Sequence, residues 1–155
     1  MNALNLMLVD DEERFLTTTT KLLERRGHRV ATATSGQEAL DKLERQEVEV
    51  VILDVKMPGM DGLAVLREIR LRFPLVSVIM LTGHGTIESA VDGMKLGAFD
   101  FVTKPCDIDD LVAKAEEAAS RRRALEEKIR QARLMTAIRS PRELVREADG
   151  KGERR

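Results

Sequence analysis

Five residues with reactive side chains stand where short apolar segments of the sequence end. Asp10 and Asp11 follow the first such segment, and Asp54 follows the third. Thr82 follows the fourth segment, and Lys104 comes shortly after the fifth. Like charges a few ångströms apart repel one another by about 4 kcal/mol at an effective dielectric near 20. If the three carboxylates lie together, they therefore need a cation.

The chemistry that suits such a set is phosphoryl transfer. Mg²⁺ prefers oxygen ligands, keeps several waters and bridges carboxylates to phosphate oxygens. With the acids neutralised, Asp54 would attack a phosphorus atom in line and become an acyl phosphate. The Thr82 hydroxyl and the Lys104 ammonium would hold the oxygens of the transferred group. These residue types thus predict acceptance of a phosphoryl group through positioning and charge neutralisation.

Each of the five residues taken alone fits a simpler role. Asp or Thr at a strand end commonly caps the next helix, so only the coincidence of all five favours a site. Phosphatases with an aspartyl nucleophile need a second Asp two residues later, and that position is Lys56. The P-loop, the dinucleotide fingerprint G-x-G-x-x-G and the G-x-S-x-G elbow are absent from the sequence. These enzyme classes are therefore excluded.

The apolar segments that would position the five residues are short and rich in Val, Ile and Leu, as in parallel strands covered on both faces. They span residues 4–9, 30–33, 48–53, 76–81 and 98–102. Segments with helical spacing alternate with them, which predicts an α/β fold with a doubly wound, five-stranded parallel sheet. Ligands of such sheets bind beyond the carboxyl ends of the strands, where the reactive residues fall.

Several residues mark the ends of the predicted helices. Ser35 and Glu38 predict a capping box, while Gly27 and Gly97 predict helix ends. Pro58–Gly59 predicts a turn before the helix that begins near residue 62.

The order of the motifs resembles the receiver domains of two-component signalling over about residues 4–120. The motifs are DD, then D with KMPGMDG, then TGHG and FVTKP. The resemblance implies a flavodoxin-like sheet in the order 2-1-3-4-5 and phosphorylation of Asp54 by a sensor histidine kinase. It also implies that Asp11, Asp54 and the Lys56 backbone carbonyl bind Mg²⁺ directly, and that Asp10 acts largely through water.

The same resemblance implies a conformational switch. The Thr82 hydroxyl would move toward the phosphoryl group, an aromatic side chain matching Phe101 would turn inward, and the fourth helix, fifth strand and fifth helix would present a changed face. Phe101 fits a plain core aromatic equally well. His84, two residues after Thr82, occupies a position that tunes phosphate lifetime in this family, although a loop histidine is more often simply solvated.

Composition sets the domain organisation and the compartment. The 155 residues, 43% hydrophobic and 34% charged, fit one globular domain, a receiver at 1–120, and a helical extension at 121–155 with a frayed end. The only cysteine, Cys106, excludes an intramolecular disulfide and favours a reducing, cytoplasmic location. The N-terminal residues lack the pattern of a signal peptide or an anchor, and no membrane partner is expected.

The last helix is predicted to begin after a cap at Asp107 and to run past residue 135, with a second short helix from Ser140 to Gly150. Arg122 and Thr136 interrupt a heptad row that indicates dimerisation or partner docking. Its members are Ile108, Leu111, Ala115, Ala118, Leu125, Ile129 and Ala132. Basic and acidic residues interleave in this part of the chain and no aromatic residue occurs there, which argues against nucleic acid as a partner.

The predicted function is that of a response regulator, with no enzymatic activity beyond its own phosphorylation and dephosphorylation. The signal would pass to an output protein that the sequence does not name. A homodimer is also expected, formed through the fourth helix, fifth strand and fifth helix or through the C-terminal helix. One alternative is an interaction or dimerisation module that works without phosphate. Another is the N-terminal receiver fragment of a longer activator, because TGHG and GAFDFVTKP resemble receivers of nitrogen-regulation type activators. No ATPase motif occurs, and with the 155 residues taken as the full length a stand-alone regulator is favoured.

Overall fold

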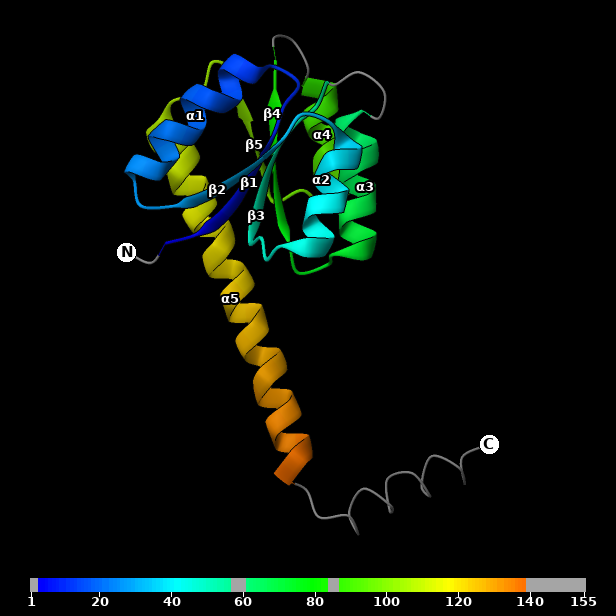
Figure 1. Cartoon of the computed structure of the whole chain (residues 1–155). Helices are drawn as coiled ribbons and strands as arrows, with labels where there is room; N and C mark the ends of the chain where they lie inside the picture. Colours follow the sequence, from blue (N-terminus) through cyan, green and yellow to red (C-terminus); the bar gives the residue numbers. More distant parts are fainter. Residues whose placement is uncertain (1–2, 57–60, 84–86, 139–155) are drawn as a thin grey trace. The chain divides into compact units, whose positions relative to one another are not determined.

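The computed structural model describes residues 3–56, 61–83 and 87–138. The chain divides into two compact units, residues 1–122 and 123–155, each of which is described by itself. The first unit holds a five-stranded sheet in the order β2-β1-β3-β4-β5 (Figure 1). All neighbouring strands pair in parallel, which confirms the predicted doubly wound sheet and its flavodoxin-like order.

Strands and helices alternate along the described residues. The strands are β1 (Asn5–Val9), β2 (Arg29–Ala33), β3 (Val50–Asp54), β4 (Ser77–Thr82) and β5 (Asp100–Thr103). The helices are α1 (Glu13–Arg25), α2 (Gly36–Arg45), α3 (Gly62–Arg72), α4 (Ile87–Lys95) and α5 (Ile108–Ile138). Every predicted strand is present, within two residues at each end.

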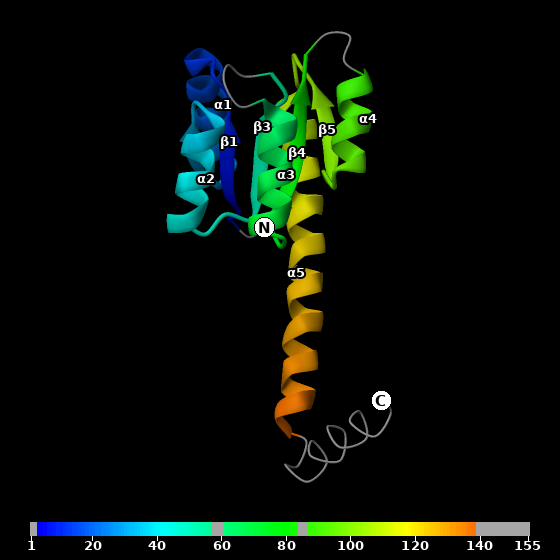
Figure 2. The same cartoon turned by 90° about the vertical axis from the view of Figure 1, so that its right-hand side faces the viewer.

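Helices cover both faces of the sheet, so the central strands are buried on both sides. In the first unit, α1 and the start of α5 lie on one face, and α2, α3 and α4 lie on the other (Figure 2). Along β3, Val51 and Leu53 belong to the core under α2 and α3, whereas Val50 and Ile52 belong to the core under α1 and α5. This alternation explains why β3 is apolar without a polar face.

The predicted helix ends agree with the structure except in one detail. The Ser35 hydroxyl caps α2 by accepting a hydrogen bond from the Glu38 N–H at 3.1 Å. A capping box would also have the Glu38 carboxylate accept from the Ser35 N–H. Here it accepts instead from the N–H and hydroxyl of Thr34, one residue earlier, at 3.4 and 3.1 Å. Gly27 and Gly97 follow α1 and α4 with φ of 90° and 101°, in the left-handed region that favours glycine.

Helix α5 begins after Asp107, whose carboxylate accepts a hydrogen bond from the Asp109 N–H at 2.9 Å, and it runs past residue 135 as predicted. Leu111, Ala115 and Ala118 of the heptad row are buried in the core of the first unit. The first half of that row is therefore explained by packing within the receiver domain and is not evidence of a coiled coil.

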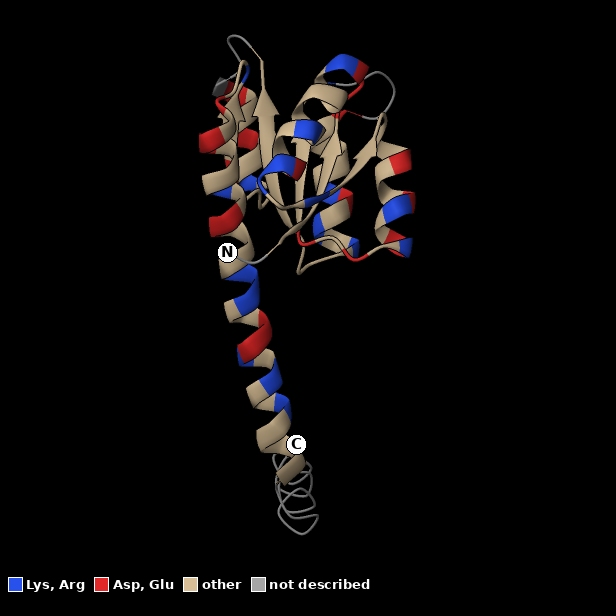
Figure 3. Cartoon of the chain, turned by 60° about the vertical axis from the view of Figure 1, so that its left-hand side comes forward, with Lys and Arg blue, Asp and Glu red and all other residues tan. Residues whose placement is uncertain are grey.

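The described part of the second unit, residues 123–138, is helical, and its acidic and basic side chains interleave (Figure 3). Four of its large apolar side chains are exposed: Leu125 by 46%, Leu134 and Met135 by 60% each, and Ile138 by 67%. No described helix combines the length and the apolar character of a membrane span. The predicted Pro58–Gly59 turn, His84 and the helix predicted from Ser140 lie outside the described residues.

Candidate functional site

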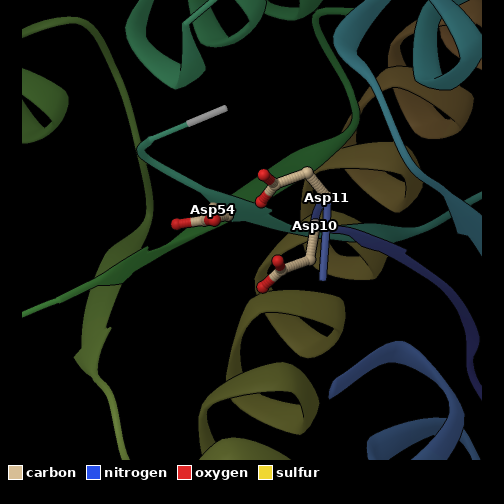
Figure 4. A group of neighbouring side chains, drawn as sticks. All are labelled: Asp10, Asp11 and Asp54. Atoms are coloured by element: carbon tan, nitrogen blue, oxygen red, sulfur yellow. The ribbon is translucent and has the colours of Figure 1, made fainter. Parts of the chain in front are cut away.

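Three carboxylates meet beyond the carboxyl ends of β1 and β3 (Figure 4). These strands are neighbours, so the residues that follow Val9 and end β3 come side by side. Oxygen atoms of Asp10, Asp11 and Asp54 all lie within 4.8 Å of one another. Asp10 and Asp54 are buried while Asp11 is exposed, so the group is open to solvent on one side.

Lys104 brings a positive charge to this group from the segment after β5. Its backbone N–H donates to the Thr82 carbonyl at 2.7 Å, which ties the end of β5 to the end of β4. Its ammonium pairs with Asp10 Oδ2 and lies 3.8 Å from Asp54 Oδ2. Thr82 is almost fully buried at the end of β4. The structure thus places the five residues singled out from the sequence at one edge of the sheet.

The electrostatics of Asp54 favour a bound cation. Burial, followed by the charge of Asp10, raises the pKa of Asp54 to about 6, against the opposing effect of Lys104. The Lys56 N–H donates to Asp54 Oδ1 at 3.3 Å and also opposes the rise in pKa. Because one ammonium does not balance the carboxylates, the charge and the all-oxygen donors of this group fit a small divalent metal ion.

The carboxylate of Asp10 and the ammonium of Lys104, which lie beside Asp54, are themselves held by hydrogen bonds. The Glu12 N–H donates to Asp10 Oδ1 at 2.9 Å, which orients that carboxylate while its other oxygen pairs with Lys104. Burial lowers the pKa of Lys104, but its hydrogen bond to Asp10 and the charges of Asp54, Asp10 and Glu12 outweigh burial and raise that pKa. The ammonium therefore stays charged at neutral pH.

Gly62 supports the site from the start of α3. Its N–H donates to the Val55 carbonyl at 2.8 Å, and the Asp61 carboxylate caps the helix by accepting from the Ala64 N–H at 2.9 Å. A Cβ on Gly62 would lie only 2.4 Å from the Asp54 carbonyl oxygen. The sequence predicted that a helix begins near this glycine, but it did not reveal that the helix presses on the backbone that carries Asp54.

A second contribution that the sequence did not reveal comes from Phe15 on α1. Its ring lies under the Lys104 ammonium, with 4.3 Å between Nζ and the ring centroid. In the sequence Phe15 is only one apolar residue at helical spacing, so no signal connected it to a lysine 89 positions later.

Phe101 lies on the edge strand β5 and is 39% exposed, so it is not a core aromatic. Val91 and Met94 on the neighbouring helix α4 are also exposed, by 46% and 43%. These side chains give α4 and β5 exposed apolar surface, and both elements belong to the switch that the resemblance to receiver domains implies.

Comparison with known proteins finds relatives for the part of the chain that forms the sheet and its helices. Residues 6–116 match the response regulator receiver domain. The chain is 40% identical over 113 residues to the DNA-binding transcriptional regulator NtrC of Klebsiella pneumoniae, covering 73% of the chain and 24% of NtrC. It is 38% identical over 115 residues to the transcriptional regulatory protein ZraR of Escherichia coli K12, covering 74% of the chain and 26% of ZraR.

Solved structures agree with this result. A response regulator receiver domain protein from Clostridium thermocellum is 38% identical, with a TM-score of 0.76 over 79% of this chain and 98% of that one. The receiver domain of NtrX from Brucella abortus is 36% identical, with a TM-score of 0.72 over 75% of this chain and 98% of that one. The chain spans about a quarter of the length of the curated relatives it matches. With its 2-1-3-4-5 sheet and its match over residues 6–116, the chain belongs to the receiver domains of two-component response regulators.

Proposed function

We propose that Asp54 is the phosphoryl acceptor of this receiver and that a sensor histidine kinase is its donor. The observation that carries the proposal is the placement of Asp54, which lies buried at the end of β3 beside two other carboxylates. The Lys104 ammonium lies 3.8 Å from one of its oxygens, where it can meet a phosphoryl group as well as the carboxylate. A capping or core role would need neither the clustered acids nor the lysine.

The residues proposed to hold Mg²⁺ are Asp10, Asp11 and Asp54, with the Lys56 backbone carbonyl as a fourth oxygen. Asp11 and Asp54 would bind it directly and Asp10 largely through water. When bound, the ion supplies positive charge between the carboxylates and the phosphate oxygens. Every donor in this set is an oxygen atom, which supports Mg²⁺ over softer metals that prefer nitrogen and sulfur.

In the proposed reaction, an oxygen of Asp54 attacks the phosphorus atom of a phosphohistidine or of acetyl phosphate. The new O–P bond forms as the donor's P–N or P–O bond breaks, and the bonding electrons leave with the imidazole or the acetate. Lys104 would hold one phosphoryl oxygen through its ammonium, and Thr82 would hold another through its hydroxyl. Beyond this acyl phosphate and its hydrolysis we propose no catalytic activity.

Phosphorylation is proposed to change the face formed by α4, β5 and α5. Thr82 would move toward the phosphoryl group and Phe101 would turn inward from its half-exposed position. The exposed Val91 and Met94 border the same face, so a second copy or an output protein would find apolar surface there.

The output is proposed to reach transcription when the receiver is part of a longer protein. The relatives named as transcriptional regulators are about four times longer than the matched segment, and one of them is named DNA-binding. Contact with DNA would then belong to a part outside this chain. A stand-alone cytoplasmic regulator that acts by protein contact is the other form of the same proposal.

The experiment is incubation with acetyl phosphate, with and without Mg²⁺, followed by intact-mass measurement. Wild type should gain one phosphoryl mass only with Mg²⁺, and Asp54→Asn should gain none. Asp41→Asn, which removes an exposed carboxylate on α2, is the matched control and should be labelled like wild type. Labelling of Asp54→Asn equal to that of wild type would contradict the assignment of Asp54 as the phosphoryl acceptor.

A second candidate, an interaction or dimerisation module independent of phosphate, is favoured by one observation. Leu125, Leu134, Met135 and Ile138 expose apolar side chains in the described part of residues 123–155. Light scattering decides between the candidates. A mass that is the same with and without beryllium fluoride as a phosphoryl mimic supports the constitutive module, and a mass that rises with the mimic supports the switch.

A further inference from the structure

The position of the Lys104 ammonium depends on a flexible side chain. A lysine has a four-carbon stem and donors that rotate, so it needs partners to hold its charge at one place. Three partners surround Nζ: Asp10 in an ion pair, Asp54 at 3.8 Å, and the ring of Phe15 at 4.3 Å from its centroid. The ammonium is therefore held by two carboxylates and by one aromatic face.

The three partners differ in whether their attraction for the ammonium changes when the site is occupied. Asp10 and Asp54 belong to the proposed site, so their charge is shared with any metal ion or phosphoryl group that enters. The ring of Phe15 carries no charge that titrates and belongs to α1, outside the carboxylate cluster. It is thus the partner whose attraction for the ammonium stays the same while the site changes its occupants.

The contact between Lys104 and Phe15 is closer than the other cation–π contacts among the described residues. The other two cations placed over aromatic rings among the described residues are Arg72 over Phe73, at 5.4 Å, and Arg121 over Phe99, at 5.7 Å. The side chain of Lys104 is only 21% exposed, and an ammonium withdrawn from water interacts more strongly with a ring.

Packing alone could also account for Phe15, because its ring contacts the core under α1 and α5. The ring lines a groove of about 710 Å³ together with Lys104, Leu22, Pro105 and Ile108. A side chain that only filled space there could be replaced by another apolar side chain of similar size. A ring that holds an ammonium could be replaced only by another ring.

We propose that Phe15 is a positioning residue that holds the Lys104 ammonium toward Asp54 for phosphoryl transfer, a role that rests on the proposed function of Asp54. Phe15 itself touches neither the phosphoryl donor nor the acceptor oxygen. It acts through Lys104, and its effect should vanish when the lysine is absent.

The test measures initial rates of labelling by acetyl phosphate at several concentrations in the presence of Mg²⁺. This small donor needs no protein docking, so a role of Phe15 in binding a kinase does not enter the measurement. Phe15→Leu should lower the maximal labelling rate by about three- to tenfold, the range expected for one cation–π contact. Phe15→Tyr keeps the ring and should stay within about twofold of wild type.

Two further comparisons separate positioning from packing. Leu22→Ala is the matched control, because it truncates an apolar side chain of the same groove about two helical turns, or roughly 10 Å, from Phe15. It should leave the labelling rate unchanged. In a Lys104→Met background, Phe15→Leu should cause no further loss, since the two residues act as one unit.

The outcomes keep the two proposals apart. A wild type that takes no label contradicts the proposed function, and with it the role of Phe15. If wild type is labelled but Phe15→Leu and Phe15→Tyr have equal rates, only the role of Phe15 is contradicted. The same holds if Phe15→Leu lowers the rate in the Lys104→Met background as much as it does in wild type. Thermal unfolding verifies that each variant is folded, and Phe15→Met, which also lacks a ring, replaces Phe15→Leu if that variant is unfolded.

Discussion

Gly62 lies against the backbone of Asp54 so closely that a Cβ at Gly62 would stand 2.4 Å from the Asp54 carbonyl oxygen. It would also stand 2.6 Å from the Val55 Cα. Both atoms belong to backbone, which cannot turn aside as a flexible side chain can. The position of α3 and the position of the proposed phosphoryl acceptor are therefore coupled through this glycine.

Gly62→Ala is expected to lower the free energy of unfolding by about 1–3 kcal/mol, as overpacking commonly does, and to slow labelling by acetyl phosphate. The slowing follows because either α3 or the segment that carries Asp54 must shift. Urea unfolding and intact-mass rates measure the two effects. Gly83→Ala is the stability control, because a Cβ there meets no atom within 4 Å. An unfolding free energy of Gly62→Ala equal to that of wild type would contradict the coupling.

The raised pKa of Asp54 predicts a pH-dependent stability in the absence of divalent ions. The pKa is about 6 in the folded protein against 3.8 ordinarily, so the folded state holds the proton more tightly than the unfolded state. Stability is therefore lost as pH rises from about 4 to 6 and stays low above pH 6. The loss is at most about 3 kcal/mol, since each pKa unit corresponds to about 1.4 kcal/mol.

Asp54→Asn removes that loss, because its amide does not ionise. In EDTA at pH 7.5 the variant should unfold at a higher urea concentration than wild type, and the difference should shrink toward pH 4. Asp41→Asn, an exposed carboxylate on α2, should follow wild type at every pH. An Asp54→Asn protein less stable than wild type at pH 7.5 would show that burial and Asp10 do not destabilise the ionised carboxylate.

Mg²⁺ should stabilise wild type, because an ion that binds only the folded state shifts the unfolding equilibrium. At ten times its dissociation constant the gain is about 1.4 kcal/mol. Asp11→Asn removes an exposed member of the carboxylate group and should reduce this gain, whereas Asp41→Asn should keep it. Thermal unfolding with and without MgCl₂ measures the gain. Equal gains in wild type and Asp11→Asn would exclude Asp11 as a ligand.

Much of the fold is readable from the sequence because parallel strands covered on both faces are continuous apolar runs. All five strands were placed in this way, and the reactive residues follow from the rule that strand ends of one direction share an edge. The strand order is different, because hydrophobic patterning does not encode which strand lies beside which. That order was predicted only from the resemblance to receiver domains.

What the sequence missed are contacts between residues far apart in the chain. Phe15 and Lys104 meet because α1 packs beside the segment after β5, and nothing in either local pattern records the contact. The heptad row of α5 shows the opposite case, a regular pattern that does not correspond to one surface of contact. Leu111 and Ala115 are apolar because they enter the receiver core, and Leu125 is apolar but exposed, so one period describes two different environments.

Asp54 is tested as the phosphoryl acceptor most sharply by locating the acyl phosphate on the chain. Wild type is labelled with acetyl phosphate and Mg²⁺, the acyl phosphate is reduced with borohydride, and the protein is digested with trypsin. Cleavage after Arg45 and Lys56 releases residues 46–56, in which Asp54 is the only aspartate. We expect homoserine in place of Asp54 in this peptide, dependent on Mg²⁺. An unmodified peptide 46–56 in protein that has gained the phosphoryl mass would contradict the assignment of Asp54.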